Sequence, residues 1–131
     1  MEDLNPQHPY DISRVPKCPN DLLARIYKAF QSRQYEIDIH AFERMNQRNV
    51  SPRDIPHIVL NGAPIEYDAV DTKKNRVPGV LFNGETSGGR PLHVKVTEEL
   101  RRDKHKHYVV TVYEPNEATF YDGFSKRRTR T

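Results

Sequence analysis

Three side chains on one predicted helix could act together on a charged substrate. His40, Arg44 and Arg48 are spaced four residues apart, so a helix over about residues 38–48 places them in one stripe on one face. Like charges at this spacing cost roughly 0.2–0.5 kcal/mol per pair, and a bound phosphate would offset that repulsion. The alternative is a solvated polar face on which the long arginine side chains splay apart.

A second set of reactive side chains lies on two predicted strands. His93 and Lys95 alternate with apolar residues of one strand, and Thr111 and Tyr113 alternate with those of the next, so each pair shares a face of a sheet. Each residue also has a purely structural interpretation. His93 can be a hydrogen-bonded, half-buried histidine, Lys95 a solvent-facing guard of a sheet edge, and Tyr113 a core aromatic residue.

Together the two sets contain the groups that cleave RNA without a metal. A base removes the proton of the 2′-hydroxyl, an acid protonates the leaving 5′-oxygen, and cations stabilise the phosphorane. Histidine titrates near neutral pH, arginine binds phosphate through paired hydrogen bonds, and tyrosine can donate a proton or stack on a base. The sequence contains no acidic cluster suited to Mg²⁺ and no Cys/His spacing typical of zinc. We therefore expect neither a metal nor a cofactor.

The composition is that of a small basic domain. The 131 residues fit one domain with a modest core. A net charge of +3 and an isoelectric point of about 9.0 favour an anionic partner. No apolar run approaches the roughly 18 residues of a membrane helix, and the N-terminus has no secretory signal. Cys18 is the single cysteine, which excludes an internal disulfide and is typical of a reducing, cytoplasmic compartment.

An irregular arm and a first helix are predicted at the N-terminus. Residues 1–19 contain four prolines among polar residues, so we expect an arm without regular structure. Apolar side chains then recur at helical spacing over residues 21–34, and Asn20 is the expected N-cap.

Two shorter helices follow. In the helix over about residues 38–48, Ile37, Ala41 and Met45 are expected to face the core, with Phe42 as a further candidate. The next helix has a strong start signal and a glycine stop, in Ser51-Pro52-Arg53-Asp54 and Asn61-Gly62.

From residue 64 onward the pattern changes to short strands. The predicted strands cover residues 65–68, 79–82, 92–97 and 108–113, with turn signals at Asn83-Gly84 and Ser87-Gly88-Gly89-Arg90. Residues 70–78 and the charged segment 98–107 are predicted to be loops, and residues 125–131 a basic tail. Helices first and antiparallel strands afterwards predict one α+β domain over residues 20–124, with helices packed on a mostly antiparallel sheet of about four strands.

Several motifs in this order resemble the bacterial domain-of-unknown-function 4258 family, which is regarded as toxin-like within the barnase–EndoU–colicin–RelE superfamily. The resemblance covers about residues 37–128. It rests on His40-Ala41, Arg44-Met45, Arg48-Asn49-Val50-Ser51, Asp54-Ile55, Asn61-Gly62, Gly89-Arg90-Pro91-Leu92-His93-Val94 and Val110-Thr111-Val112-Tyr113-Glu114-Pro115. The closing segment 120–128 is also similar, with Phe120 where tryptophan is usual.

This resemblance implies a RelE/barnase-like fold and endoribonuclease activity in a toxin–antitoxin pair. It makes site candidates of His40 as general base, His93 as general acid, and Arg44 with Arg48 as a phosphate clamp, the two histidine roles being interchangeable. Tyr113 is a further catalytic candidate. The expected partners are RNA and a cognate antitoxin protein.

The remaining cations have two interpretations. They either bind the RNA backbone or are ordinary solvated charge; they are Lys95, Arg101, Arg102, Lys126, Arg127 and Arg128. If they bind the RNA backbone, the sequence predicts a metal-independent endoribonuclease that uses the 2′-hydroxyl as nucleophile. The alternative is a non-catalytic module that binds RNA or an acidic protein.

Overall fold

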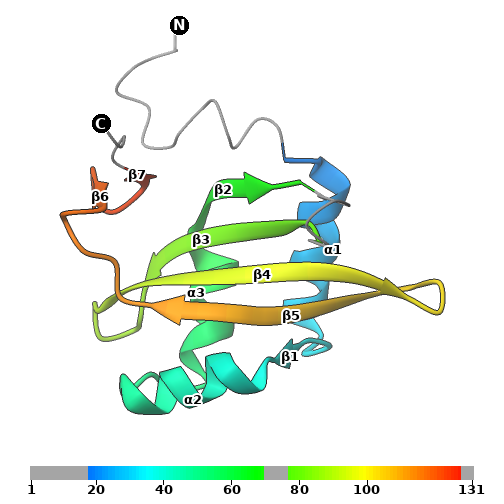
Figure 1. The fold of residues 1–131 in the computed structure, drawn as a ribbon, viewed down its shortest axis with the longest axis horizontal. Coiled ribbons are helices and arrows are strands. Elements are labelled where there is room, and N and C mark those ends of the chain that lie inside the picture. Colours follow the sequence, from blue (N-terminus) through cyan, green and yellow to red (C-terminus); the bar gives the residue numbers. More distant parts are fainter. Residues whose placement is uncertain (1–17, 70–76, 128–131) are drawn as a thin grey trace, which may run out of the picture.

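Three helices and a five-stranded sheet form the body of the protein, seen in Figure 1. The computed structural model describes residues 18–69 and 77–127. The helices are α1 (Asn20–Gln31), α2 (Ile39–Gln47) and α3 (Asp54–Asn61). The main strands are β1 (Glu36–Ile37), β2 (Ala63–Asp68), β3 (Gly79–Glu85), β4 (Pro91–Arg101) and β5 (Lys104–Tyr113), and a small hairpin pairs β6 (Phe120–Tyr121) with β7 (Lys126–Arg127). The predicted α+β class is confirmed.

The sheet is antiparallel except at one edge. Its strand order is β1-β5-β4-β3-β2, and β1 pairs in parallel with β5. Helices α1 and α3 cover one face, and α2 runs beside β5 just after β1 (Figure 1). We call the helix-covered side the inner face and the opposite side the outer face.

Amphipathic patterning explains the helices. Their apolar stripes bury Leu22, Ile26, Met45 and Ile55 in the main core on the inner face. The expected inward position of Phe42 is wrong, since 41% of this residue is exposed. Ile37 belongs to β1 and not to a helix.

Local signals at the helix ends are only partly as predicted. Ser51 and Asp54 do close the start of α3, since the Asp54 carboxylate accepts from the Ser51 amide at 3.3 Å. The predicted Asn20 cap is wrong: α1 starts after Pro19, and the Asp21 side chain accepts from the Leu22 amide at 3.0 Å. At the end of α3, a Cβ on Gly62 would lie 2.3 Å from the Asn83 carbonyl oxygen, so only glycine lets this helix end against β3.

The β4–β5 hairpin is much longer than predicted. The segment predicted as a charged loop, residues 98–107, instead extends both strands to a two-residue turn. Arg102 and Asp103 both have positive φ, 51° and 64°, as a type I′ turn requires. The predicted turn at Asn83-Gly84 is also wrong, because both residues pair with β4 inside β3.

Residues after β5 cover part of the outer face. Phe120 packs with Ile65 and Leu81 in a second, smaller core, against which Tyr113 and Phe124 also pack. The predicted polar outer face is therefore partly buried. Residues 125–127, expected in a basic tail, form or adjoin β7, while the arm residues 1–17, most of the loop at 70–78, and Arg128 lie outside the described residues. No helix within the described ranges is long and apolar enough to cross a membrane.

Candidate functional site

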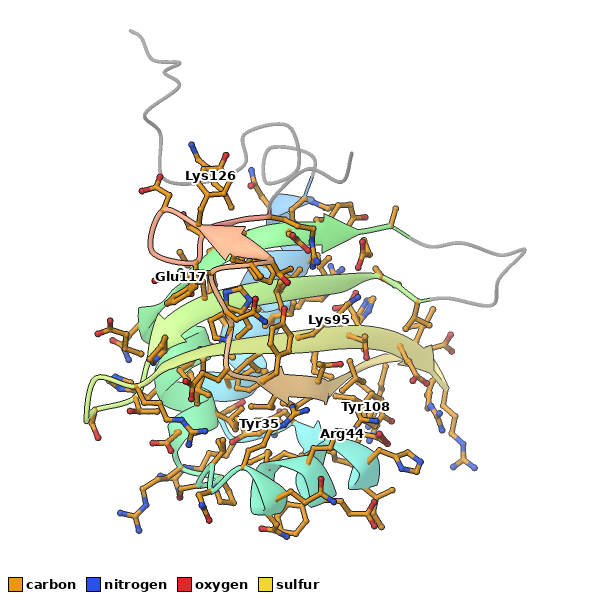
Figure 2. All side chains as sticks on the ribbon, turned by 60° about the vertical axis from the view of Figure 1, so that its left-hand side comes forward. Tyr35, Arg44, Lys95, Tyr108, Glu117 and Lys126 are labelled. Carbon is orange, nitrogen blue, oxygen red and sulfur yellow. The ribbon has the colours of Figure 1, made fainter. Side chains whose placement is uncertain are left out.

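The strand register brings the predicted strand residues together on the outer face. His93 pairs with Tyr113 and Lys95 with Thr111 across β4 and β5. Leu92, the neighbour of His93, lies in the inner core. Since side chains alternate along a strand, the reactive residues point away from α1 and α3. Figure 2 looks toward this face, with Lys95 on β4 and Arg44 on α2 labelled.

His93 is fully buried at the centre of this group. Its Nδ1 lies 3.1 Å from the Tyr113 hydroxyl and its Nε2 lies 2.8 Å from the Phe124 carbonyl oxygen. A carbonyl only accepts, so Nε2 carries the hydrogen; in neutral imidazole Nδ1 then accepts from the tyrosine hydroxyl. Burial lowers the pKa of His93 from 6.5 to about 4. At pH 7 this histidine is neutral, and both of its nitrogens are engaged.

Tyr113 links the buried histidine to an ion pair. Burial raises the pKa of its hydroxyl to about 12, so it carries its proton at neutral pH. The Arg127 guanidinium also hydrogen-bonds Tyr113. Arg127 binds the Glu66 carboxylate through two contacts, Nε–Oε2 at 2.8 Å and Nη2–Oε1 at 3.0 Å, and lies 4.7 Å from the Phe120 ring centroid. These bonds raise the pKa of Arg127, chiefly through Glu66.

Lys95 adds a second cation to the same face. Its ammonium group contacts the Asp68 carboxylate at 2.5 Å, and 32% of the lysine side chain is exposed. This lysine is on a central strand, so its predicted alternative role as guard of a sheet edge does not apply.

The helical stripe borders the outer face without joining the buried group. The His40 side chain is 80% exposed and has Glu43 at 3.8 Å. Arg44 is exposed, whereas Arg48 donates to the Val112 carbonyl at 2.6 Å and fixes α2 to β5.

His40 and His93 are not neighbours in this fold. The Asp38 amide donates to the Val109 carbonyl at 2.9 Å, so α2 begins beside Val109. Tyr113 and its partner His93 lie four residues further along β5, about 13 Å at the usual strand rise. The structure therefore pairs His93 with Tyr113 and not with His40.

The other predicted phosphate ligands are scattered. Arg101 pairs with Glu99 at 2.8 Å and lies over the Tyr108 ring, and Arg102 occupies the hairpin turn. Lys126 lies 3.9 Å from Asp122 and over the Tyr121 ring.

Four members of the group are not among the site residues predicted from the sequence: Glu66, Asp68, Phe120 and Phe124. Alternation along residues 65–68 could have placed Glu66 and Asp68 on one face. Nothing in the sequence shows that β6 and β7 fold back over that face. Among the described residues, no group of three or more His, Cys, Asp or Glu side chains is placed to hold a metal ion.

This arrangement offers two kinds of chemistry. The ammonium and guanidinium groups of Lys95 and Arg127 suit phosphate oxygens, although each already has a carboxylate partner. The Tyr113 hydroxyl is a protonated hydrogen-bond donor held in place by His93. The exposed His40 and Arg44 add an imidazole and a guanidinium group at the border of the face.

A family model described as "Domain of unknown function (DUF4258)" matches residues 38–114. The match begins just before α2 and ends just after β5, so it includes His40, Arg44, His93 and Tyr113. It leaves Arg127 outside. No curated protein and no solved structure matches the chain.

Proposed function

The chain belongs to the DUF4258 family, and from that membership and the chemistry of the outer face we propose that it is a metal-independent endoribonuclease. In this proposal it acts as a bacterial toxin in the cytoplasm and is neutralised by a cognate antitoxin protein. The outer face, together with the exposed side of α2, is the RNA-binding surface.

The observation that carries the proposal is the convergence of Tyr113, Arg127 and Lys95 on one open side of the sheet, next to the exposed His40 and Arg44. Cations and proton donors are the groups that a phosphoryl transfer through the 2′-hydroxyl needs. Held between a buried histidine and a guanidinium, the tyrosine hydroxyl has a fixed position on that face.

His93 does not serve as the acid in this mechanism. A buried imidazole with a pKa of about 4 carries no spare proton at pH 7. The general acid is instead Tyr113, which is half-buried and protonated. Its hydrogen, which the hydroxyl donates to His93 Nδ1 in the free protein, must turn to the leaving oxygen when RNA binds. Arg127, hydrogen-bonded to the tyrosine, stabilises the phenolate that forms when the proton leaves.

The proposed reaction balances with these residues. His40 takes the proton of the 2′-hydroxyl, the 2′-oxygen bonds to phosphorus, and the bond from phosphorus to the 5′-oxygen breaks. Tyr113 gives its proton to that oxygen, and the products are a 2′,3′-cyclic phosphate and a free 5′-hydroxyl. α2 begins about 13 Å along β5 from Tyr113, so His40 and Tyr113 act on one phosphodiester only if both side chains extend toward it; in this proposal the RNA lies between them and Arg44 contacts its phosphate.

The test is cleavage of a labelled RNA in EDTA by the wild type and by matched variants. His40→Ala and Tyr113→Phe should each reduce the cleavage rate by about 10²–10⁴, the usual contribution of a general acid or base. Arg44→Ala should also slow cleavage. His57→Ala and Arg53→Ala are the controls, because both residues are exposed and belong to α3 or its start; these variants should cleave like the wild type.

A second measurement separates catalysis from binding. RNA with 2′-deoxyribose at the scissile position should bind to the wild type and resist cleavage. His40→Ala should bind this RNA with unchanged affinity. If His40→Ala loses binding and cleavage equally, or if the wild type binds RNA and never cleaves it, the chain is a binding module and the nuclease proposal is wrong.

A further inference from the structure

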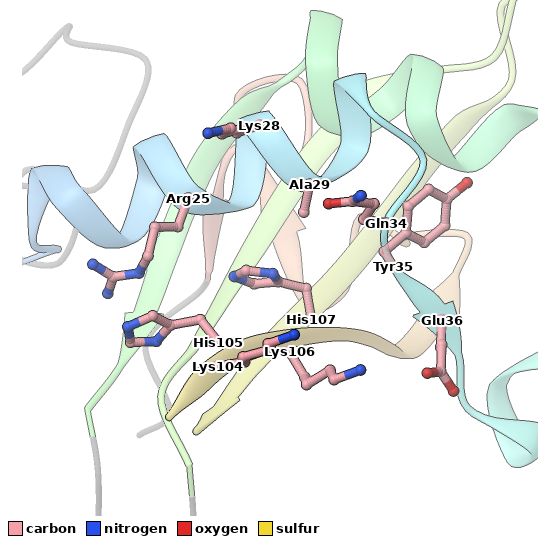
Figure 3. Close-up of a pocket in the computed structure, with 10 residues that line it drawn as sticks. All are labelled: Arg25, Lys28, Ala29, Gln34, Tyr35, Glu36, Lys104, His105, Lys106 and His107. Carbon is pink, nitrogen blue, oxygen red and sulfur yellow. The ribbon is translucent and has the colours of Figure 1, made fainter. Parts of the chain in front are cut away.

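A cleft at the open edge of β5 lies apart from the proposed RNA surface. It encloses about 530 Å³ between α1, the segment after α1 and the start of β5 (Figure 3). Its lining includes Ala29 of α1, then Gln34 and Tyr35, and the four consecutive residues 104–107 of β5. Side chains of consecutive strand residues point to opposite faces, so a cleft lined by all four must face the backbone edge of the strand.

Among the strands that the structure describes, none pairs with this backbone edge over residues 104–106. β1 pairs with β5 only at Tyr108 and Val109. The Val109 carbonyl accepts from Asp38 on this side, and backbone groups two residues apart point the same way along a strand. His105 therefore presents its N–H and C=O to the cleft. Within the described residues, this is a strand edge with room beside it for another strand.

A cluster of charged side chains on the inner face holds this edge in place. Glu98, buried on the inner face of β4, binds Arg25 of α1 through two contacts of 2.8 Å. It also contacts His107 at 2.8 Å and His105 at 3.3 Å. These contacts join α1 to the β4–β5 hairpin, so the two walls of the cleft are fixed relative to each other before anything binds.

The charge of the cleft indicates what it would accept. Four of the ten lining residues are lysine or arginine, two are histidine, and one, Glu36, is acidic. Arg25 is occupied by Glu98. Lys28, Lys104 and Lys106 form no ion pair within 4.0 Å among the described residues, and Glu99 of β4 stands opposite Lys106. A strand that pairs with β5 would have its own side chains opposite Lys104 and Lys106, where acidic residues are favoured.

A second copy of this chain fits the same edge poorly. Two β5 edges related by a two-fold axis would bring Lys104 and Lys106 of each copy next to the same lysines of the other. Like charges directly across a strand pair are destabilising, and lysines on an edge are a known device against self-pairing.

We infer that the β5 edge at residues 104–107 is a docking site for an extended acidic segment of a partner protein, which adds a strand to the sheet. The side chains of that segment alternate: acidic residues lie next to Lys104 and Lys106, and small or apolar residues point into the cleft toward Ala29 and Tyr35. Backbone hydrogen bonds to His105 supply affinity and the lysines supply selectivity. The site does not depend on RNA cleavage.

The test uses two fluorescent hexapeptides, Glu-Val-Glu-Val-Glu-Val and its charge-reversed counterpart Lys-Val-Lys-Val-Lys-Val. The acidic peptide should bind the full chain and the basic peptide should not. On binding, the backbone amide of His105 should become protected from hydrogen exchange, as measured by NMR. His105→Pro removes the outward N–H at a position where an edge strand tolerates proline. It should weaken binding by about tenfold or more, the value of one to two backbone hydrogen bonds.

Two controls separate strand addition from other effects. His105→Ala keeps the N–H and removes only the side-chain contact to Glu98, so it should weaken binding much less than His105→Pro. A Lys104→Glu/Lys106→Glu double variant, altered only at the surface, should prefer the basic peptide. Equal binding to His105→Pro and wild type, with unchanged circular dichroism, would show simple charge attraction and overturn the inference. So would an acidic peptide that does not bind, a His105 amide already protected in the free chain, or a dimer in sedimentation experiments that His105→Pro dissolves.

Discussion

Acid should destabilise this protein through His93. In the unfolded chain the imidazole has its ordinary pKa of 6.5, and in the folded protein burial lowers that pKa to about 4. Between these values the unfolded state binds more protons, so the free energy of unfolding rises with pH in this range. The stability contributed by neutral His93 is complete above pH 6.5 and is lost as the pH falls toward 4.

The size of this effect follows from the pKa difference. A lowering from 6.5 to about 4 corresponds to about 3 kcal/mol of unfolding free energy. His93 is fully buried, so solvent does not screen this contribution. Two charged groups face the imidazole, and they act in opposite directions: Glu66 raises its pKa and Arg127 lowers it. Desolvation by burial is the largest effect, so the pKa of His93 is lowered and not raised.

Urea unfolding at a series of pH values between 7.5 and 4 measures this slope. His93→Gln is the informative variant, since glutamine can accept from Tyr113 and donate to the Phe124 carbonyl but does not titrate. The variant should lose most of the pH dependence between 6.5 and 4, whereas His57→Gln, at an exposed position, should keep it. The same slope in His93→Gln as in the wild type would refute the assignment of a buried neutral histidine.

Two further predictions concern stability. Arg127→Ala removes the two hydrogen bonds that Arg127 donates to the Glu66 carboxylate, in a residue only 8% exposed, and should lower the free energy of unfolding by about 2 kcal/mol. Arg101→Ala, at an exposed site, should change it by no more than about 0.5 kcal/mol; equal losses would mean that β7 does not hold the outer face. Asp103→Gly should raise stability by about 0.5–1 kcal/mol in chemical denaturation, because glycine adopts the φ of 64° without strain. A less stable variant would contradict a type I′ turn at this position.

The helices and the central strands could be predicted because their signals are local. The apolar stripe of α1, the Ser51 to Asp54 start of α3 and the alternation around Val94 all depend on neighbours in sequence. The length of the β4–β5 hairpin could not be predicted in the same way. Its outer half is rich in charge, and the stabilising partner of Glu98 is Arg25, which lies 73 residues away. Only the folded chain shows that the charged segment is paired strand and not loop.

The candidate site has the same division between local and long-range signals. Strand alternation placed His93 with Lys95 and Thr111 with Tyr113, and the strand register brings the two pairs together on the outer face, but the role of each residue depends on what covers that face. Phe120 and Phe124 come from beyond β5. They bury His93, which was expected to be the general acid, and its pKa falls to about 4. Tyr113, which keeps its proton at neutral pH, therefore takes the role of general acid that was expected of His93. Since that change comes from residues outside the matched family region, a relative without an equivalent of β6 and β7 should have an accessible histidine at this position, with a pKa closer to 6.5. Titration of such a relative by NMR would show whether the covering hairpin, and not the strand pair itself, decides which residue carries the proton.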